Sequence, residues 1–377
     1  MQHFSYVPSF GILSTHPPTP CGLATFSAAL SERLAAKGAA VSVVRIADGD
    51  ASAEPNVVGE LVNGQPASVT ATAELLNQND VAVIQHEYGI YGGPDGDEVV
   101  QIMEALRVPS IVILHTVLDD PTPYQRSVLE QVVALADQVV VMSDAALQRL
   151  CAGYAVDRRK VATIPHGALL PNTVAVKPPS RPTILTWGLL GPGKGIERVI
   201  DAMASLRGLP GRPRYLIAGR THPKVIDAQG EAYREALIAQ AKRVGVADMV
   251  SFDAEYRTPA ELTALIQTAA VVVLPYDSRD QVTSGVLVDS LASGRPIVAT
   301  AFPHAVEMLA GGAGIVVDHD DADALVAALR RLLTDPHVAD SMANEARGLA
   351  PTIAWPVVAS AYVAVAQRLL AAQSALT

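Results

Sequence analysis

The chain has 377 residues, a formal net charge of −10 and a hydrophobic content of 50%. This length is too great for one ordinary core and suits two domains, and the apolar content excludes intrinsic disorder. The acidic balance, without any run of Lys and Arg, argues against nucleic acid as a partner. The two cysteines, Cys21 and Cys151, lack the spacing of metal ligands and are typical of a reducing compartment.

Export and membrane signals are not evident in the sequence. Residues 1–10 lack a basic stretch followed by an apolar one, so we expect no signal peptide. No run of 18 or more apolar residues occurs, so we expect no transmembrane segment and a cytoplasmic location.

The first half of the chain alternates short apolar runs with helical patterns. In chain order we expect strand 6–13, helix 25–36, strand 40–46, strand 81–85, helix 97–106, strand 110–114, helix 124–135, strand 138–142, helix 144–150 and strand 161–164. Apolar strands separated by helices predict a parallel sheet that helices cover on both faces.

A segment with four prolines, 170–182, indicates a linker. We therefore place an N-terminal domain at 1–172 and a C-terminal domain at 173–356, with a final helix at 357–377 returning to the N-terminal domain. The expected elements of the second half are strand 183–187, helix 196–206, strand 214–218, helix 231–243, strand 250–252, helix 259–268, strand 270–275, helix 285–292, strand 296–300, helix 305–309, strand 314–317 and helix 322–334. Both halves are thus α/β units, and ligands are expected at the carboxyl ends of their strands.

A glycine-rich loop from Gly188 to Gly195 joins an expected strand to an expected helix. Such a turn lets a pyrophosphate meet backbone N–H groups and the helix dipole, and Lys194 adds a positive charge. The loop is neither a Walker A sequence, because Gly195 replaces the required Ser or Thr, nor a dinucleotide-binding GxGxxG. Alone it is equally typical of a plain turn with a solvated lysine.

A second polar segment precedes the helix expected at 285–292. Ser284 and Gly285 form a small helix start whose amides can bind an anionic or hydroxyl-rich group. Asp289 lies four residues after Gly285 on the same helix face and can accept hydrogen bonds from a ribose diol. The same residues are also typical of a helix that is simply capped by Ser284, with a solvated Asp289.

Four histidines follow expected strands, where side chains reach a ligand at the sheet edge. They are His86, His115, His166 and His222. Their spacing is not that of a zinc site, so we interpret them as hydrogen-bonding residues. In the loop after the first strand, Gly22 would let a ligand approach the backbone.

Taken together, these segments resemble the retaining glycosyltransferases of family 4, which have the GT-B fold of two Rossmann-like domains facing a central cleft. The likeness rests on Cys21-Gly-Leu-Ala-Thr-Phe26, Gln85-His-Glu-Tyr-Gly89, the Lys-Gly pair at 194–195, Ser284-Gly285, Ala-Ser-Gly-Arg-Pro-Ile-Val-Ala-Thr at 292–300 and His304-Ala-Val-Glu307. It covers nearly the whole chain and is specific for the family but not for a substrate.

The resemblance implies roles for individual residues. His115 matches a histidine that contacts the transferred sugar, and Lys194 matches a lysine on the pyrophosphate. Gln281 and Asp289 stand at the two ends of the family's Glu-x7-Glu motif, which contact sugar hydroxyls and the ribose. The remaining positions are donor contacts at Gly22, Gly188, Ser284, Gly285 and Val286, and acceptor contacts at His86, Glu87, Tyr88, His166 and His222.

Three positions depart from the family pattern. Gln281 keeps hydrogen-bonding capacity but cannot serve as an ionised nucleophile, and Asp289 is one methylene shorter than glutamate. Leu189 stands where the family usually has an arginine, and Arg220 is a candidate to replace that arginine.

The implied reaction is metal-independent, retaining transfer of a hexose. GDP-mannose is the preferred donor, on a likeness to mannosyltransferases, and a UDP- or ADP-sugar with glucosyl transfer is also compatible with the sequence. The expected acceptor is a soluble saccharide or glycoside, as in polysaccharide biosynthesis, and a homodimer is one option. A phosphorylase or sugar-phosphate synthase would share the same cleft, and so would a non-catalytic sugar-nucleotide-binding homologue.

Overall fold

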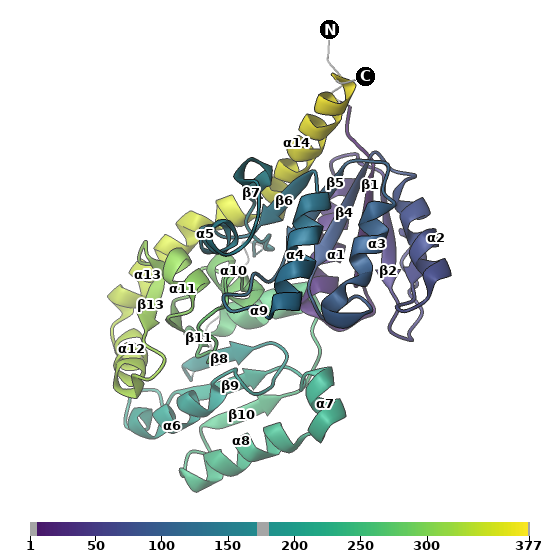
Figure 1. The fold of residues 1–377 in the computed structure, drawn as a ribbon. Helices are drawn as coiled ribbons and strands as arrows, with labels where there is room; N and C mark the ends of the chain where they lie inside the picture. Colours follow the sequence, from purple (N-terminus) through teal and green to yellow (C-terminus); the bar gives the residue numbers. More distant parts are fainter. Residues whose placement is uncertain (1–5, 172–180, 376–377) are drawn as a thin grey trace. The chain divides into compact units, whose positions relative to one another are not determined.

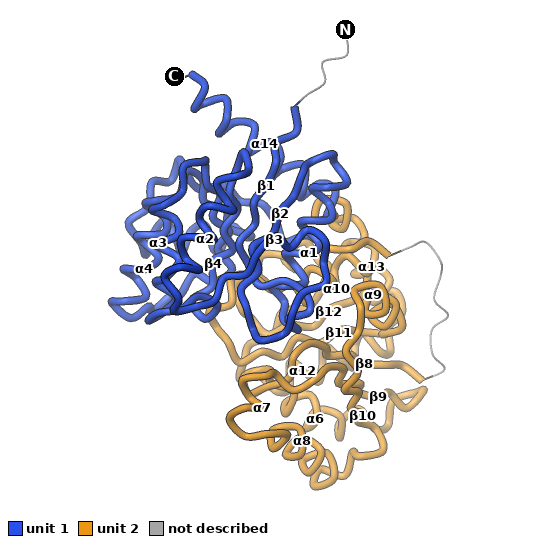
Figure 2. Tube along the Cα trace, turned by 90° about the vertical axis from the view of Figure 1, so that its right-hand side faces the viewer, with its two compact units in different colours: residues 1–167, 355–377 blue, residues 168–354 orange. Residues whose placement is uncertain are grey.

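The computed structural model describes residues 6–171 and 181–375. Its two compact units are residues 1–167 with 355–377, here called unit 1, and residues 168–354, here called unit 2 (Figure 2). The predicted linker at 170–182 lies largely outside the described residues, and so does the predicted boundary at 172–173.

Unit 1 contains a seven-stranded sheet with helices on its faces (Figure 1). Its main elements are β1 (Phe10–Ser14), α1 (Gly22–Ala35), β2 (Val41–Ile46), β3 (Val57–Leu61), α2 (Pro66–Leu76), β4 (Val81–His86), α3 (Glu98–Glu104), β5 (Ser110–Leu114), α4 (Pro123–Leu135), β6 (Gln138–Val141), α5 (Asp144–Gly153), β7 (Val161–Thr163) and α14 (Trp355–Ser374). The strand order is β3-β2-β1-β4-β5-β6-β7 and the strands pair in parallel.

Unit 2 repeats this scheme with six parallel strands in the order β10-β9-β8-β11-β12-β13. Its main elements are β8 (Thr183–Trp187), α6 (Ile196–Leu206), β9 (Arg214–Ala218), α7 (Pro223–Gln229), α8 (Ala232–Arg243), β10 (Val250–Asp253), α9 (Pro259–Thr268), β11 (Val271–Leu274), α10 (Gly285–Ala292), β12 (Ile297–Thr300), α11 (Pro303–Leu309), β13 (Gly314–Val317), α12 (Ala322–Thr334) and α13 (Pro336–Leu349). Two hydrophobic clusters form its core, and both include residues of the central strands.

The predicted α/β organisation of both halves is confirmed, and several elements have the predicted bounds. Central strands such as β5 and β8 are buried along almost their whole length, which is why a continuous apolar run identifies them. Local capping signals also act as expected: Thr258 and Glu261 form a capping box at the start of α9, with a proline in its first turn.

Four of the strands and α-helices named above were not predicted. They are β3, α2, α7 and α13. The edge strand β3 alternates half-buried and exposed residues, and α7 buries none of its residues, so neither carries a strong apolar pattern. The first strand was predicted to start at Tyr6, whereas β1 starts at Phe10.

Helix α14 is the one described helix that is long and apolar enough to cross a membrane by length and composition. In unit 1 it packs against α1, and Trp355, Val358, Ala359 and Tyr362 are among its buried residues. Only 33% of its most apolar window is buried in the structure.

Candidate functional site

The strand order of each sheet defines where a ligand is expected. In both sheets the order reverses next to the first strand, between β1 and β4 in unit 1 and between β8 and β11 in unit 2. In open parallel sheets this switch point is where ligands bind, beyond the carboxyl ends of the strands. Most of the predicted site residues follow strands at or beside these two places, whereas His166 follows the edge strand β7.

In unit 2 the glycine-rich loop packs tightly against neighbouring backbone. Gly195 has φ +62°, and a Cβ there would lie 1.7 Å from the carbonyl oxygen of Pro275. Gly219, after β9, has φ +142°, and its Cβ would lie 1.9 Å from the oxygen of Gly188. The Asp277 N–H donates to the oxygen of Gly193 at 2.9 Å, which joins this loop to the loop after β11. The glycines therefore permit a close approach of two loops at the switch point.

Lys194 lies at the centre of this arrangement. Its Nζ is 4.7 Å from the ring centroid of Tyr276, and Tyr276 stacks on Phe302 with 5.3 Å between centroids. Burial lowers the pKa of Lys194, because a desolvated ammonium is costly. Among the described residues, no carboxylate forms an ion pair with Lys194. A partly buried cation that lies over an aromatic face and has no carboxylate partner among the described residues is suited to an anionic ligand.

The start of α10 presents backbone N–H groups close to the same tyrosine. Ser284 caps the helix, its Oγ accepting from the Leu287 N–H at 3.2 Å, and it also hydrogen-bonds the Tyr276 side chain. No acceptor within the described residues takes the N–H groups of Gly285 and Val286. The predicted helix start is confirmed, and the Ser284 cap is present beside these available amides.

The side chains of Gln281 and Asp289, at the two ends of the predicted motif, lie in different environments. Gln281 donates its Nε2 to the oxygen of Thr283 at 3.0 Å, so its amide stabilises its own loop. Asp289 is partly buried, and burial raises the pKa of its carboxyl to about 7. It therefore stays partly protonated near neutral pH and can donate to a ribose hydroxyl as well as accept from it.

Arg220 and His222 follow β9. The guanidinium of Arg220 is exposed and lies 5.7 Å from the ring centroid of Tyr256. His222 caps α7 through its Nδ1, which accepts from the Lys224 N–H at 3.1 Å, so it has a structural role. Burial and the nearby charges of Lys224 and Lys194 lower the pKa of His222.

In unit 1 the site consists of side chains. The ring of His115 hydrogen-bonds the Oε1 of the buried Gln85 through its Nε2, and its centroid is 5.0 Å from that of Phe26. Phe26 also contacts the rings of His166 and Trp355, at 5.0 and 5.1 Å. Burial lowers the pKa of His115 to about 3 and that of His166 to about 4, so both imidazoles are neutral at physiological pH.

The three predicted acceptor contacts after β4, at residues 86–88, differ in burial. His86 is 1% exposed, its Nδ1 has no hydrogen-bond partner within the described residues, and burial lowers its pKa to about 4. Its ring lies 5.1 Å from that of Tyr88, whereas Glu87 accepts a hydrogen bond from the Thr116 hydroxyl. His86 thus lies in the interior, while Glu87 is partly exposed beside Thr116.

Gly22 is the first residue of α1 and is exposed, with no atom within 4 Å of the position of a Cβ. Cys21 caps this helix: its Sγ accepts from the Ala24 N–H at 3.4 Å. The loop therefore ends in a helix N-terminus whose first residue leaves the backbone accessible.

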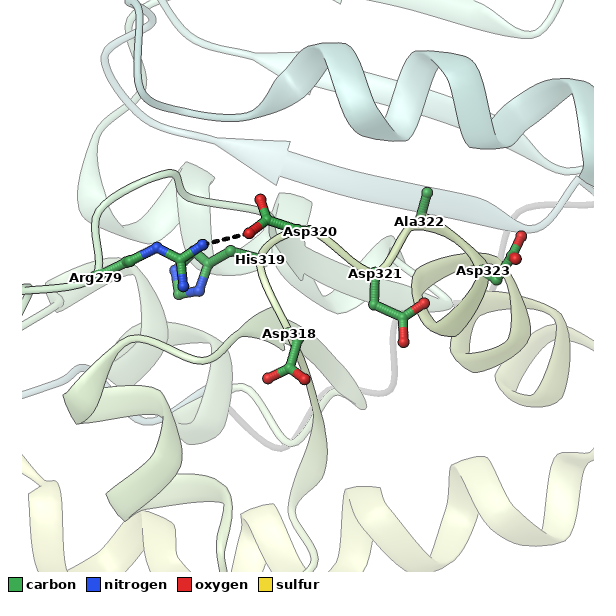
Figure 3. Close-up of a pocket in the computed structure, with 7 residues that line it drawn as sticks. All are labelled: Arg279, Asp318, His319, Asp320, Asp321, Ala322 and Asp323. Carbon is green, nitrogen blue, oxygen red and sulfur yellow. Dashed lines mark hydrogen bonds and ion pairs between the residues drawn. The ribbon is translucent and has the colours of Figure 1, made fainter.

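An acidic pocket follows β13. Its volume is 740 Å³, and Asp318, Asp320, Asp321 and Asp323 line it together with Arg279 and His319 (Figure 3). Arg279 forms an ion pair with Asp320 at 2.6 Å. Four carboxylates disfavour a diphosphate, so this pocket is not the expected anion site. Within the described residues, no group of three or more His, Cys, Asp or Glu side chains could hold a metal ion.

Several residues that contact the predicted site residues were not themselves predicted as part of a site. Gln85, Phe26 and Trp355 surround the histidines of unit 1, and Tyr276 lies beside Lys194. Of these, Gln85 and Phe26 belong to segments that carried the family resemblance, so only their roles were missed. Trp355 and Tyr276 are distant in sequence from the residues that they contact, and no local signal identifies them.

Comparisons with known proteins match this architecture. Residues 20–168 match the family "Glycosyltransferase Family 4", and residues 173–349 match "Glycosyl transferases group 1". A D-inositol 3-phosphate glycosyltransferase of Segniliparus rotundus is 28% identical over 288 residues, which are 70% of this chain and 62% of that protein. That of Corynebacterium urealyticum is 29% identical over 63% of this chain and 58% of its own length. The chain therefore spans about six tenths of the length of these curated relatives.

Solved structures share the fold over nearly the whole chain. Sucrose-phosphate synthase of Thermosynechococcus elongatus has a TM-score of 0.76 at 20% identity, covering 97% of this chain and 100% of its own. Anabaena HepE in complex with UDP also has a TM-score of 0.76, at 18% identity, covering 96% of this chain and 100% of its own.

The fold, the two switch-point sites and the two family matches define the class of protein. The chain has the GT-B fold, and its two parts match glycosyltransferase family models, residues 20–168 that of Family 4 and residues 173–349 that of group 1. The predicted GT-B fold is confirmed. The predicted mannosyltransferase branch stays a prediction.

Proposed function

We propose that this protein is a retaining hexosyltransferase in which unit 2 holds the nucleotide-sugar donor and unit 1 holds the acceptor. The observation that carries the donor site is the partly buried Lys194, which has an aromatic neighbour, Tyr276, and no carboxylate partner within the described residues. Tyr276 in turn hydrogen-bonds Ser284, at the start of α10. A diphosphate beside Lys194 and the amides of Gly285 and Val286 would satisfy both the charge and these N–H groups.

In the proposed reaction the diphosphate is the leaving group. The bond between the anomeric carbon and the diphosphate oxygen breaks, while the acceptor oxygen attacks from the same face and passes its proton to a diphosphate oxygen. Lys194 and the helix N-terminus stabilise the negative charge that develops on the diphosphate. The amide of Gln281 cannot form a glycosyl–enzyme ester, so this route assigns no protein nucleophile.

Within this proposal, His115 positions the sugar. Its Nε2 donates to Gln85, so the neutral ring keeps Nδ1 as an acceptor for a sugar hydroxyl. A cationic imidazole is excluded near neutral pH by its pKa of about 3, and general acid catalysis by His115 is not part of the proposal.

No metal ion is required by the proposed site. Lys194 and the N-terminus of α10 supply the positive potential that a divalent cation would otherwise provide. Arg220 is a second cation after the neighbouring strand, and we propose that it approaches the nucleotide when the donor binds.

For the donor, a UDP-sugar and GDP-mannose are the two leading candidates. The solved structure of Anabaena HepE contains UDP, and another structure of the same protein contains UDP-glucose, which favours a UDP-sugar here. GDP-mannose rests on the sequence resemblance alone. We therefore place the UDP-sugar first.

For the acceptor, we propose an uncharged polyhydroxyl compound such as a saccharide or glycoside. The relatives are named for D-inositol 3-phosphate, and a phosphate group needs available cations. The arginines that reach the loops after β2 and β5 already have partners: Arg45 with Asp48 and Glu60, and Arg149 with Asp119. The remaining groups at this edge, such as Gln85 and the neutral histidines, suit hydroxyl groups better than phosphate.

A thermal-shift screen tests this assignment. The protein would be heated with UDP, GDP, ADP and dTDP, each with and without magnesium. A ligand that binds only the folded state raises the melting temperature by mass action, so one nucleotide should stabilise the protein without magnesium. Stabilisation by none of the four would contradict the donor site, and a strict magnesium requirement would contradict the metal-independent part. Product analysis with mannose, glucose and inositol 3-phosphate as acceptors then tests the choice of acceptor.

A further inference from the structure

A histidine of the next helix hydrogen-bonds both ends of the four-residue segment before α10. His304, in α11, is 1% exposed. Its Nδ1 accepts a hydrogen bond from the Ser284 N–H at 2.9 Å, and its own backbone N–H donates to the oxygen of Gln281 at 3.3 Å. His304 therefore contacts both ends of the segment from Gln281 to Ser284.

These bonds decide which N–H groups remain available at the helix start. The Ser284 N–H is occupied by His304, and the Ser284 Oγ accepts from Leu287. The next two backbone N–H groups are those of Gly285 and Val286, and neither has a hydrogen-bond acceptor among the described residues. The direction of these two N–H groups depends on the backbone angles of Ser284. The hydrogen bond from the Ser284 N–H to His304 helps to fix those angles.

Buried residues after β12 and β13 contact the loop that precedes this segment. Thr300 donates its hydroxyl to the oxygen of Tyr276 at 2.7 Å, and Phe302 stacks on the Tyr276 ring. The buried His319 hydrogen-bonds the oxygen of Ser278 through its Nε2 at 3.1 Å. Contacts from the segments after β12 and β13 thus support the loop between β11 and α10, and His304 is the one among them that reaches the helix start.

We propose that His304 is a positioning residue of the donor site, whose Nδ1 acceptor orients the N–H groups of Gly285 and Val286 toward the diphosphate. This inference rests on the proposed donor site in unit 2. An imidazole that accepts at Nδ1 is neutral and carries its proton on Nε2. An apolar residue at this place would leave the buried Ser284 N–H without a partner, which typically costs about 1–3 kcal/mol.

Asparagine and glutamine provide a matched pair of variants. The side-chain oxygen of asparagine can occupy the place of Nδ1, whereas that of glutamine reaches one bond farther, to the place of Nε2. His304→Asn therefore keeps the acceptor for Ser284, and His304→Gln moves it away. His304→Leu removes the acceptor altogether.

The test measures the binding of nucleotides to the full chain by calorimetry. The probes are UDP and UMP, or GDP and GMP if the wild type binds guanine nucleotides. We expect His304→Leu and His304→Gln to weaken diphosphate binding about 5- to 100-fold, because misaligned N–H groups of Gly285 and Val286 would lose part of their hydrogen bonding to the charged diphosphate. His304→Asn should stay within about threefold of the wild type, and monophosphate binding should change less than diphosphate binding in every variant.

Three results would overturn the inference: unchanged diphosphate binding in His304→Leu and His304→Gln, equal losses for diphosphate and monophosphate, or an Asn variant as weak as the Gln variant. Thermal unfolding without ligand shows whether each variant is folded. If His304→Leu does not fold, the comparison of His304→Asn with His304→Gln tests the inference. Failure of the wild type to bind any nucleoside diphosphate would instead contradict the proposed function.

Discussion

The candidate sites of the two units use different kinds of groups. In unit 2, backbone N–H groups, glycines and one lysine gather at the switch point, and Gly188, Gly193, Gly195 and Gly219 have positive φ angles. In unit 1, neutral histidines, Gln85 and two aromatic rings gather at the corresponding edge. Backbone amides and a cation suit phosphate, whereas neutral side chains with lone pairs and N–H groups suit hydroxyls. In the proposed function, the same fold therefore provides an anion site in unit 2 and a site for hydroxyl groups in unit 1.

Replacement of a glycine in unit 2 should have the largest effect. Gly195→Ala would place a Cβ 1.7 Å from the Pro275 oxygen at a φ of +62°, so we expect a loss of about 3 kcal/mol or more in unfolding free energy. Gly193→Ala is the matched control, because its φ is +88° but nothing lies within 4 Å of its Cβ. Urea unfolding followed by the fluorescence of Trp187, in a Trp355→Phe background, reports on unit 2. Equal losses in the two variants would show that the close contact is unimportant.

Acidification should weaken unit 1. The pKa values of His86, His115 and His166 are lowered to about 4, 3 and 4 from 6.5, so below pH 6.5 the unfolded chain binds protons that the folded chain does not. Stability is therefore present above pH 6.5 and falls toward pH 4, by up to about 1.4 kcal/mol per pH unit for each histidine. Urea unfolding in a Trp187→Phe background would measure this, and a midpoint unchanged between pH 7 and pH 5 would contradict it.

The pH dependence that Asp289 contributes to the stability of unit 2 is opposite to that of the histidines of unit 1. Its pKa is raised from 3.8 to about 7, so the folded state holds a proton that the unfolded state has lost, and its contribution declines as pH rises from 3.8 to 7. Asp289→Asn should therefore raise the melting temperature at pH 8 more than at pH 4. An equal change at the two pH values would show that the carboxyl titrates normally.

Loss of Lys194 should weaken donor binding and leave stability nearly unchanged. Lys194→Ala removes the proposed charge-assisted contact with the diphosphate, so we expect nucleotide affinity to fall about 10- to 100-fold. The exposed Lys224, in α7, provides the control, since Lys224→Ala should have little effect. A Lys194→Ala variant that binds UDP or GDP as tightly as the wild type would rule out this role.

Gln85 tests the hydrogen-bond arrangement of unit 1. Gln85→Leu removes the acceptor of the His115 Nε2–H, and we expect kcat to fall about tenfold while nucleotide affinity stays unchanged. Nitrogen NMR of the His115 ring should show a proton mainly on Nε2 in the wild type and a mixture of tautomers in the variant. A wild-type ring protonated on Nδ1 would refute the assigned acceptor role.

The smallest effect is expected at the acidic pocket. Arg279 and Asp320 form an ion pair in which both side chains are well exposed, at 61% and 84%. Asp320→Ala should therefore change stability by less than about 1 kcal/mol and leave transfer intact. A large loss of transfer would show that the pocket in Figure 3 belongs to the functional site after all.

The sequence by itself determined the two parallel α/β units, because buried strands such as β5 and β8 are short continuous apolar runs. It also located Lys194, Ser284 and His115, since each follows a strand or starts a helix and therefore lies in a local pattern. Elements with weak apolar patterns, such as β3 and α7, were missed for the same reason.

Only the tertiary structure decided which residues surround these positions. Tyr276 beside Lys194, Trp355 near Phe26 and His304 on Ser284 join segments that are far apart in the chain. It also separated the four histidines: His115 and His166 share an aromatic cluster, His86 is buried, and His222 caps a helix. Such differences depend on strand register and on long-range packing, which no local pattern of residues encodes.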